Sequence, residues 1–510
     1  MSKKGLIKST GVIGIATAVS RVLGFVRDIV IARFFGTAIY AQAFVVAFRI
    51  PNLLRDLIGE GATNAAFVPV FTEELSKKGK RELFELAQVM LNILLVVLTI
   101  ITFLGMWASP LIVKLIAPGF ASDPDKFHVT VMLTRVLFPF LILVGLWAYA
   151  MGILNSLGHF AAPAYGPCVL NLCMIFCAAW FGENVMGLAS GVLAGGVMQI
   201  LIQIPSLYKS GWRARFTFKF HHPQARKIGL LLIPRALGAC VYQVNVFIST
   251  ILASLSSIAG EGAVAALYYA NRIWQLPLAI FGIALAQAAL PAMSRHVVAS
   301  DMQKMKETVS FSLRVLVLIL VPSTVGLALL RAPIIRVLFE RGAFTAYSTS
   351  ITADALFFYS LGLAACGGIK VLVSAFYSMR DTVTPLKTAG LSLAINVILN
   401  LALMFPLKIG GLALATSLSA IFNFTALYVL LERRVGSIGT ALLADSIMRV
   451  TAASFAMGVS LALSVALFNP MTVFTLIFTI LAGILVFGIS GYLFAVREIR
   501  DAFLWISKKR

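Results

Sequence analysis

Five arginines lie within otherwise apolar stretches of the chain, where together they could hold an anion. They are Arg21, Arg27, Arg49, Arg55 and Arg272. The planar guanidinium group donates paired hydrogen bonds that match phosphate oxygens, so these residues favour a phosphate-bearing ligand. The nearby acids are fewer, namely Asp28, Asp56 and Glu60. Net positive charge therefore remains around the arginines, whereas an exporter of cations would need the opposite balance.

The rest of the chain indicates a membrane protein, in which such charge is costly. Hydrophobic residues make up 60% of the sequence and charged residues only 12%, with a mean hydropathy of +0.95. A soluble domain is closer to one quarter charged. An arginine at the bilayer centre costs ~2.5–3.5 kcal/mol on insertion scales, or roughly 15 kcal/mol for five. These side chains must therefore face a wet cavity or a partner charge.

Long unbroken apolar runs predict an all-α polytopic membrane protein, because the strands of a membrane β-barrel alternate polar and apolar residues. We expect about fourteen transmembrane helices. Their ranges are 10–33, 42–70, 86–108, 129–157, 163–181, 185–207, 229–257, 264–292, 309–330, 350–379, 384–405, 411–431, 449–468 and 471–494. The first is expected to be retained rather than cleaved as a signal, because Arg21 interrupts its apolar run.

Lysine and arginine are distributed unequally between the two sides of the predicted membrane. The tails and the loops on their side hold 25 of the 42, and the opposite loops hold seven. The richest loop, 208–228, has six basic residues and no acid. This asymmetry predicts that both termini are cytoplasmic. The net charge of +22 is then a topology signal with some attraction to anionic lipid, and a nucleic-acid partner is not expected.

Ten basic residues remain inside the predicted spans. Besides the five arginines above, they are Arg135, Arg235, Arg314, Lys370 and Lys387. Arg135, Arg235, Arg314 and Lys387 lie near span ends, where a long side chain can reach the interface.

The chain has an internal repeat with an offset of about 222 residues, as in transporters built from two repeated halves. Arg49 in FRIPNLLRD falls on Arg272 in NRIWQLP, and LIAPGF (115–120) falls on LFERGAF (338–344). Each unit contains six helices, so the two units share one orientation about an axis along the membrane normal. We therefore expect two six-helix lobes, a linker and an extra C-terminal helix pair. Their ranges are 1–207, 208–228, 229–431 and 432–510.

Helical spacing suggests how the first two spans present their charge. Arg21 and Asp28 are seven residues apart, so they share a face and could pair, with Arg27 about a third of a turn away. Asn52, Asp56, Gly59 and Thr63 form one stripe on the second span. The alternative to a ligand-binding cavity is a set of internal ion pairs that hold the helices together.

At these residues the chain resembles the MurJ (MviN) family, the lipid II flippases of bacterial peptidoglycan synthesis. The stretches that carry the resemblance are SRVLGFVRD (20–28), FRIPNLLRDLIGEGATNAAFVPVF (48–71), APGF (117–120), YYANRIWQLP (268–277) and AFYSMRDTVTP (375–385). The resemblance implies the fold of the multidrug/oligosaccharidyl-lipid/polysaccharide exporter superfamily, with alternating access. It also implies a bacterial cytoplasmic-membrane location, a functional monomer, and a C-terminal helix pair that forms a groove for the lipid tail.

The resemblance also assigns roles to individual residues. It places the essential cavity arginines at Arg21, Arg27, Arg55 and Arg272. The last three would grip the diphosphate of lipid II, and Asp28 would orient an arginine. The chain departs from some members at Gln42, Asn271 and Gln275, where those members carry acids, so its cavity should be more basic.

Energy coupling has two candidate sources. Asn396, Asn400 and Thr416 are similar to positions of a sodium site in the family, although one member has a carboxylate near Asn400. The alternative is that these amides pack helices together and that the membrane potential drives an anionic headgroup outward. Sodium is the one cofactor that the sequence suggests.

Other functions remain to be weighed against a lipid II flippase. A multidrug exporter, or an exporter of another polyprenyl-linked oligosaccharide, would share the architecture. The excess of arginine argues against cationic drugs but does not separate lipid II from other polyprenyl diphosphates. An integral-membrane glycan polymerase would need a constellation around an acid such as Asp123, Asp125 or Glu340, and none can be argued. We therefore expect a transporter rather than an enzyme.

Overall fold

The computed structural model describes residues 3–55, 66–214, 219–468 and 470–500, without the side chains of 3–10, 54–55 and 232–242. Every regular element in these ranges is a helix. Nine of these helices are long and apolar enough to cross a membrane. The count becomes ten if α16 (Ala346–Ser360) and α17 (Leu363–Ser378), bent by 44°, form one span. The all-α polytopic class is confirmed, and the number fourteen stays a prediction.

All fourteen predicted ranges fall wholly or partly on helix. Two of them, 384–405 and 411–431, lie within a single long element, α18 (Val383–Val435). A break at Lys408, with φ 50° and ψ −126°, separates its two parts. Pro406 lies two residues earlier and cannot donate a backbone hydrogen bond, which favours a break at this point.

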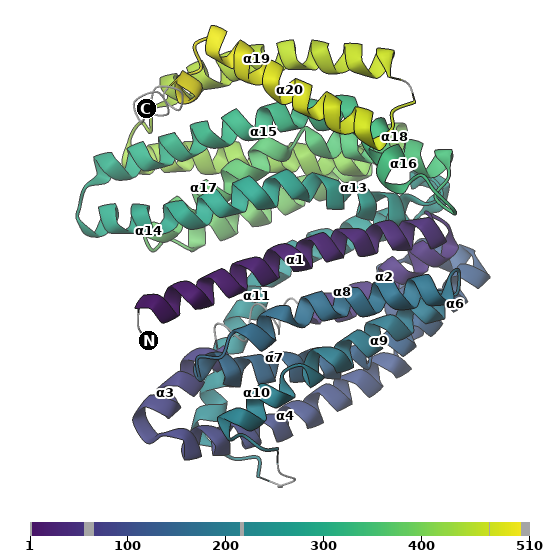
Figure 1. Cartoon of the computed structure of the whole chain (residues 1–510), viewed down its shortest axis with the longest axis vertical. Coiled ribbons are helices and arrows are strands. Elements are labelled where there is room, and N and C mark those ends of the chain that lie inside the picture. Colours follow the sequence, from purple (N-terminus) through teal and green to yellow (C-terminus); the bar gives the residue numbers. More distant parts are fainter. Residues whose placement is uncertain (1–2, 56–65, 215–218, 469, 501–510) are drawn as a thin grey trace. The chain divides into compact units, whose positions relative to one another are not determined.

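By packing, the chain divides into two compact units, of which unit 1 comprises Met1–Leu255 with Arg341–Phe344. Its helices are α1 (Lys3–Phe35), α2 (Ile39–Arg55), α3 (Val68–Lys78), α4 (Lys80–Trp107), α5 (Ser109–Ile116), η2 (Pro118–Ser122), α6 (Pro124–Leu137), α7 (Phe140–Ser156), α8 (Ala161–Phe181), α9 (Val185–Leu201), α10 (Ile204–Ser210) and α11 (Pro223–Ser254). Helix α8 packs against both α1 and α9 (Figure 1). Buried Tyr149 joins α7 to α4 by donating a 2.6 Å hydrogen bond to the carbonyl of Ala87.

Unit 2 comprises Ser256–Glu340 and Thr345–Arg510. Besides α16, α17 and α18, its helices are α12 (Ser256–Ala259), α13 (Ala263–Pro277), the π-helical η3 (Leu278–Ile283), α14 (Ala284–Val298), α15 (Met302–Phe339), α19 (Thr440–Leu467) and α20 (Val473–Leu493). Figure 1 shows α19 beside α15, with α20 crossing α19. Arg314 on α15 pairs at 2.9 Å with Glu498, which follows α20, and its expected position at the membrane interface stays a prediction.

The helices of the two sequence halves follow the same spacing. Helices α4 and α15 begin at Lys80 and Met302, and α6 and α16 begin at Pro124 and Ala346, so the two pairs have the same separation along the chain. This separation agrees with the predicted offset of the repeat. Packing nevertheless places α11 in unit 1, although the repeat makes it the first helix of the second half. The predicted lobe boundaries and the packing units therefore differ at this helix.

Two loops at corresponding positions of the repeat make tight contacts inside unit 1. Gly119 donates its backbone N–H to Ser254 Oγ at 3.1 Å, at the end of α11. Ala343 donates its N–H to the carbonyl of Arg33 at 2.8 Å, near the end of α1. A Cβ at Gly119 would lie 2.1 Å from the Ser254 carbonyl oxygen. A Cβ at Gly342, where φ is +61°, would lie 2.3 Å from the Arg33 carbonyl oxygen.

We expect Gly119→Ala and Gly342→Ala each to destabilise the protein by about 1–3 kcal/mol, because backbone must shift to admit the methyl group. The matched control is Gly390→Ala on α18, where nothing lies within 4 Å of an added Cβ. Thermal unfolding of the purified variants in detergent measures the effect. Midpoints of both loop variants equal to that of the control would contradict close packing at these loops.

Candidate functional site

The charges of the first helix form a buried network between α1 and α8. Arg27 and Asp28 are only 6% and 1% exposed. Arg27 Nε and Nη2 donate to Asp28 Oδ1 at 3.0 and 2.7 Å, and its Nη1 donates to Asn171 Oδ1 at 3.0 Å. The Asn171 amide in turn donates to the carbonyl of Ser20 at 3.1 Å. This network fixes the position of the Arg27 guanidinium group.

The pairing of Arg21 with Asp28, one of the two alternatives left open by the sequence, is not the one observed, because Asp28 pairs with its neighbour Arg27. The Cα atoms of Arg27 and Asp28 lie on different faces of α1. The Arg27 side chain is nevertheless long and flexible enough to reach the Asp28 carboxylate. Arg21 lies exposed on α1. Within unit 1, Arg21 is thus the more accessible of the two cations for an incoming anion.

Arg49 joins α2 to α11. Its Nη1 donates to the carbonyl of Val246 at 2.9 Å and to the hydroxyl of Thr250. These two contacts hold the Arg49 guanidinium group between α2 and α11. Its predicted part in substrate binding stays a prediction.

The remaining predicted residues of the second span lie mostly outside the described structure. Arg55 is the last residue of α2, and its side chain is not described. Asp56, Gly59, Glu60 and Thr63 lie outside the described residues altogether. Their roles stay predictions.

Arg272 lies in unit 2, on α13, where it is half-buried. Its guanidinium carbon lies 4.9 Å from the ring centroid of Tyr268, one turn earlier, and Nη2 donates to the Tyr268 hydroxyl at 3.1 Å. Stacking on an aromatic ring fixes the plane of the guanidinium group. The N–H donors along its edge are then oriented to bind an oxyanion. Asn271 and Gln275, which lie near Arg272 on α13, have neutral amide side chains.

The structure describes each unit by itself, so a common cavity for Arg272 and the arginines of unit 1 stays a prediction. Gln42 is buried in unit 1 and donates to the carbonyl of Thr37 at 3.2 Å. This short-range bond gives Gln42 a local structural role between α1 and α2.

The three candidate sodium ligands lie on the two parts of α18, and two of them take part in a buried network of amides. Asn400 Nδ2 donates to Asn396 Oδ1 at 2.7 Å, and Asn396 Nδ2 donates to Ser419 Oγ at 3.2 Å. Thr416 Oγ1 donates to the carbonyl of Leu412 at 3.1 Å. Asn400 Oδ1 has no hydrogen-bond partner in the described structure. The contact between the two amides shows that they pack against each other, and a sodium-binding role for this set stays a prediction.

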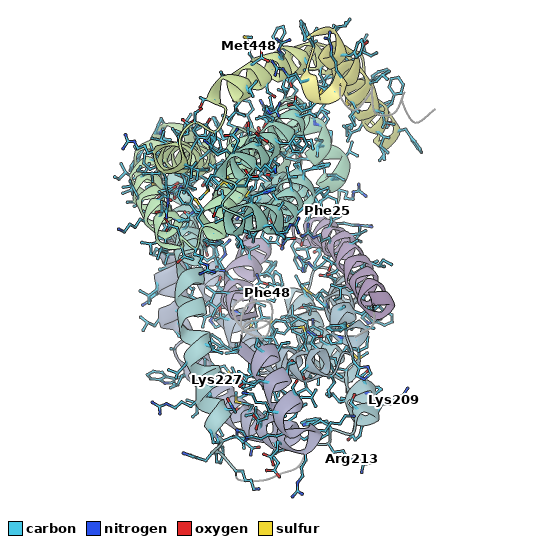
Figure 2. All side chains as sticks on the ribbon, turned by 90° about the vertical axis from the view of Figure 1, so that its left-hand side faces the viewer. Phe25, Phe48, Lys209, Arg213, Lys227 and Met448 are labelled. Carbon is cyan, nitrogen blue, oxygen red and sulfur yellow. The ribbon has the colours of Figure 1, made fainter. Side chains whose placement is uncertain are left out.

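Basic side chains gather at one end of unit 1. Figure 2 shows Lys209, Arg213 and Lys227 there, away from Phe25 and Phe48. At this end Lys227 of α11 contacts Glu73 of α3 at 2.5 Å, and Lys77 contacts the same carboxylate at 2.7 Å. Hydrogen bonds from these two ammonium groups lower the pKa of Glu73 to about 2, so the carboxylate stays ionised throughout the physiological range. The pairs link the start of α11 to α3.

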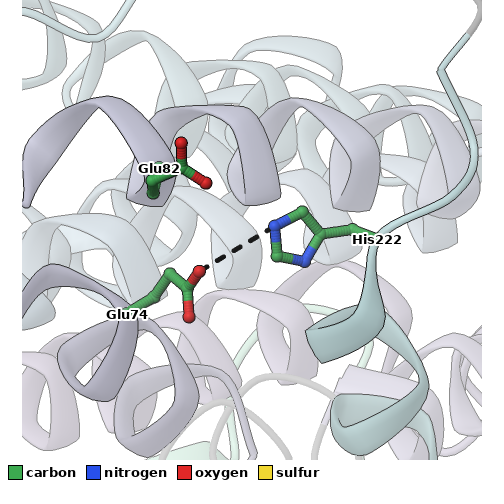
Figure 3. Close-up of side chains that lie close together, drawn as sticks. All are labelled: Glu74, Glu82 and His222. Carbon is green, nitrogen blue, oxygen red and sulfur yellow. Dashed lines mark ion pairs between the residues drawn. The ribbon is translucent and has the colours of Figure 1, made fainter. Parts of the chain in front are cut away.

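A second group beside this contact contains Glu74, Glu82 and His222, whose ligand atoms all lie within 4.8 Å of one another (Figure 3). His222 is the N-cap of α11, because its Nδ1 accepts from the backbone N–H of Gln224 at 3.2 Å. In the neutral ring the proton therefore lies on Nε2, which faces Glu74 Oε1 at 4.0 Å. Lys78 already occupies Oε1 at 2.8 Å. The cluster is thus arranged for ion pairing and helix capping.

Sequence reasoning did not find this cluster as a unit. His222 lies far along the chain from Glu74 and Glu82, and each residue by itself looks like a solvated loop charge. The loop's richness in basic residues was the only available signal.

Comparisons with known proteins agree with one another. The family model described as lipid II flippase MurJ matches residues 31–483. A probable lipid II flippase MurJ of Rhizobium tropici is 38% identical over 437 residues, covering 84% of this chain and 81% of that protein. The lipid II flippase MurJ of Burkholderia cenocepacia is 33% identical over 426 residues, with 82% of each chain covered.

Solved structures extend the match to the fold. A lipid II flippase MurJ in an inward closed conformation matches with a TM-score of 0.79 at 26% identity, covering 96% of this chain and 99% of that one. An inward-facing multidrug resistance transporter of the MATE family matches with a TM-score of 0.69 at 16% identity, covering 82% and 96%, which concerns the fold alone. The family model and both relatives align with most of the chain. This chain belongs to the MurJ family of lipid II flippases.

Proposed function

We propose that this protein moves lipid II, the undecaprenyl-diphosphate-linked peptidoglycan precursor, from the inner to the outer leaflet of the bacterial cytoplasmic membrane. The observation that carries the proposal is the family match over residues 31–483. The protein acts as a transporter by alternating access and catalyses no covalent step. Because one chain contains both halves of the repeat, we also propose that it functions as a monomer.

Both termini lie in the cytoplasm in this proposal. The lysine and arginine count supports that orientation, and the basic end of unit 1 in Figure 2 is then its cytoplasmic end. The positive charge there serves orientation and attraction to anionic lipid, and no nucleic-acid partner is proposed.

The arginines have different roles in the proposal. Arg272, stacked on Tyr268, contacts the diphosphate of lipid II. Arg21 and Arg55 contribute further positive charge along the substrate path. Arg27 and Asp28 hold α1 against α8 and so act as positioning residues for that path. Arg49 positions α2 against α11 in the same way.

Lipid II binding by the purified protein, followed by native mass spectrometry, tests the substrate. The competing lipids are undecaprenyl phosphate and a phospholipid, and a cationic dye tests the multidrug alternative. Preference for lipid II is the expected result. Preference for the dye, or equal binding of lipid II and phospholipid, would overturn the proposal.

We propose that the membrane potential drives transport, because the Asn396–Asn400 network favours a packing role for these amides. An inside-negative potential assists outward movement of an anion by ~2.3 kcal/mol per charge per 100 mV. In proteoliposomes at fixed potential, lipid II flipping should be equal in sodium and potassium, and should slow when the potential is collapsed. A requirement for sodium would contradict this coupling and restore the sodium site.

A further inference from the structure

Lys370 is a basic residue in the apolar helix α17. It belongs neither to the five arginines proposed to act on the substrate nor to the basic residues near span ends, so it has no assigned role. It lies near the middle of α17, and its side chain is exposed. No acidic side chain in the described ranges forms an ion pair with it. A lysine that faces lipid inside the hydrocarbon region is costly, up to ~2.5–3.5 kcal/mol at the bilayer centre. Its position is therefore best explained by a wet pocket or an anionic ligand.

The side chain of Lys370 lines such a pocket within unit 2. The pocket has a volume of about 230 Å³ and lies between α17 and the η3–α14 segment. Gln287 and Ser374 are its other polar lining residues, among apolar groups such as Ile283 and Leu290. Ser374 donates its hydroxyl hydrogen to the carbonyl of Lys370 at 2.9 Å, so the hydrogen-bond donors left for a ligand are the Lys370 ammonium and the Gln287 amide.

This pair of donors suits a single carboxylate. An ammonium group acts as a compact point charge, whereas a diphosphate is better matched by the planar fork of arginine. The apolar remainder of the wall lowers the local dielectric and strengthens one charge-assisted hydrogen bond. A volume of about 230 Å³ admits a carboxylate with a short side chain but not a disaccharide.

The pocket is too far from Arg272 to share one anion with it. Helix α13, η3 and α14 form one continuous segment, Ala263–Val298. Gln287 follows Arg272 by fifteen residues on this segment, which is about 22 Å at 1.5 Å per residue. A ligand that reaches both positions must carry two anionic groups on an extended headgroup.

We propose that the Lys370 pocket is a second anion subsite, which holds a carboxylate of the headgroup peptide while Arg272 contacts the diphosphate. This inference rests on the proposed function and adds a reason for selecting peptide-bearing headgroups. The Lys370 subsite binds the peptide end of the substrate. Arg272 binds the diphosphate, which all polyprenyl diphosphates share.

Native mass spectrometry with two probes tests the subsite: lipid II, which carries the peptide, and undecaprenyl diphosphate, which lacks it. Lys370→Gln should weaken lipid II binding roughly tenfold, the loss expected for one charged hydrogen bond, and leave undecaprenyl diphosphate binding within about twofold. Lys370→Arg, which keeps the charge, should retain most of the binding. Lys387→Gln, at an exposed lysine on α18, is the matched control and should change neither.

The outcomes separate the subsite from the wider proposal. Equal losses for both probes in Lys370→Gln, or no loss for either, would overturn the carboxylate subsite. Equal affinity of the wild-type protein for the two probes would overturn it as well. Failure of the wild-type protein to bind either probe above phospholipid would overturn the proposed function and the subsite together.

Discussion

Arg272→Ala should abolish lipid II transport while the protein still folds and inserts. Arg272 is half-buried on α13 and stacks on Tyr268, so this site is partly open to solvent and its removal should be tolerated by the fold. Two charge-assisted hydrogen bonds to phosphate oxygens, at roughly 1.5–3 kcal/mol each, correspond to at least a hundredfold loss of transport. Growth rescue in cells depleted of their own flippase measures function, and the thermal midpoint of the purified protein measures folding.

Two further variants separate charge from geometry at this position. Arg272→Lys keeps the charge but loses the planar fork, so we expect partial rescue. Tyr268→Phe keeps the ring beneath the guanidinium group and removes the hydroxyl that accepts the 3.1 Å hydrogen bond, so we expect nearly full activity. Full rescue by Arg272→Ala at normal expression would show that this arginine does not contact the substrate.

Arg27→Ala should act differently, by destabilising unit 1. Removing Arg27 takes away the 2.7 Å ion pair of the Asp28 carboxylate, which is only 1% exposed. Breaking a buried ion pair from one side costs about 3–5 kcal/mol, because one charge stays desolvated. The purified variant should therefore have a much lower thermal midpoint than the wild-type protein. Arg21→Ala, at an exposed position on the same helix, should leave the midpoint unchanged.

The double variant Arg27→Ala, Asp28→Ala decides the cause. If the broken ion pair of the buried carboxylate is responsible, removing the carboxylate as well should restore much of the stability lost in Arg27→Ala alone. A normal midpoint for Arg27→Ala together with lost transport would instead make Arg27 a direct substrate ligand, as the family resemblance implies.

The helices and their spacing could be predicted from the sequence because hydropathy decides where a chain crosses a membrane. Even the break inside α18 coincides with the gap between two predicted spans, since Pro406 and Lys408 interrupt the apolar run. The predicted offset of the repeat likewise reappears in the starts of α4 and α15.

The partners of the charged side chains could not be predicted in the same way. Spacing along a helix gives the face of each Cα, which favoured Arg21 for Asp28, but a guanidinium group on a flexible stem reaches a neighbouring face. The contact of Arg49 with Val246 depends on how α11 packs, and packing placed α11 in unit 1 rather than with its own half of the repeat. Local sequence patterns do not predict which distant helices pack together.

The most direct measurement is lipid II flipping by the purified protein in proteoliposomes with an imposed potential. A fluorescent lipid II that becomes accessible to a membrane-impermeant quencher reports its movement between leaflets. We predict potential-dependent flipping by the wild-type protein and only background flipping by Arg272→Ala at equal reconstitution. Flipping of both proteins at the same rate, or no flipping of lipid II by the wild-type protein, would contradict the central claim that this chain carries lipid II by its phosphate charge.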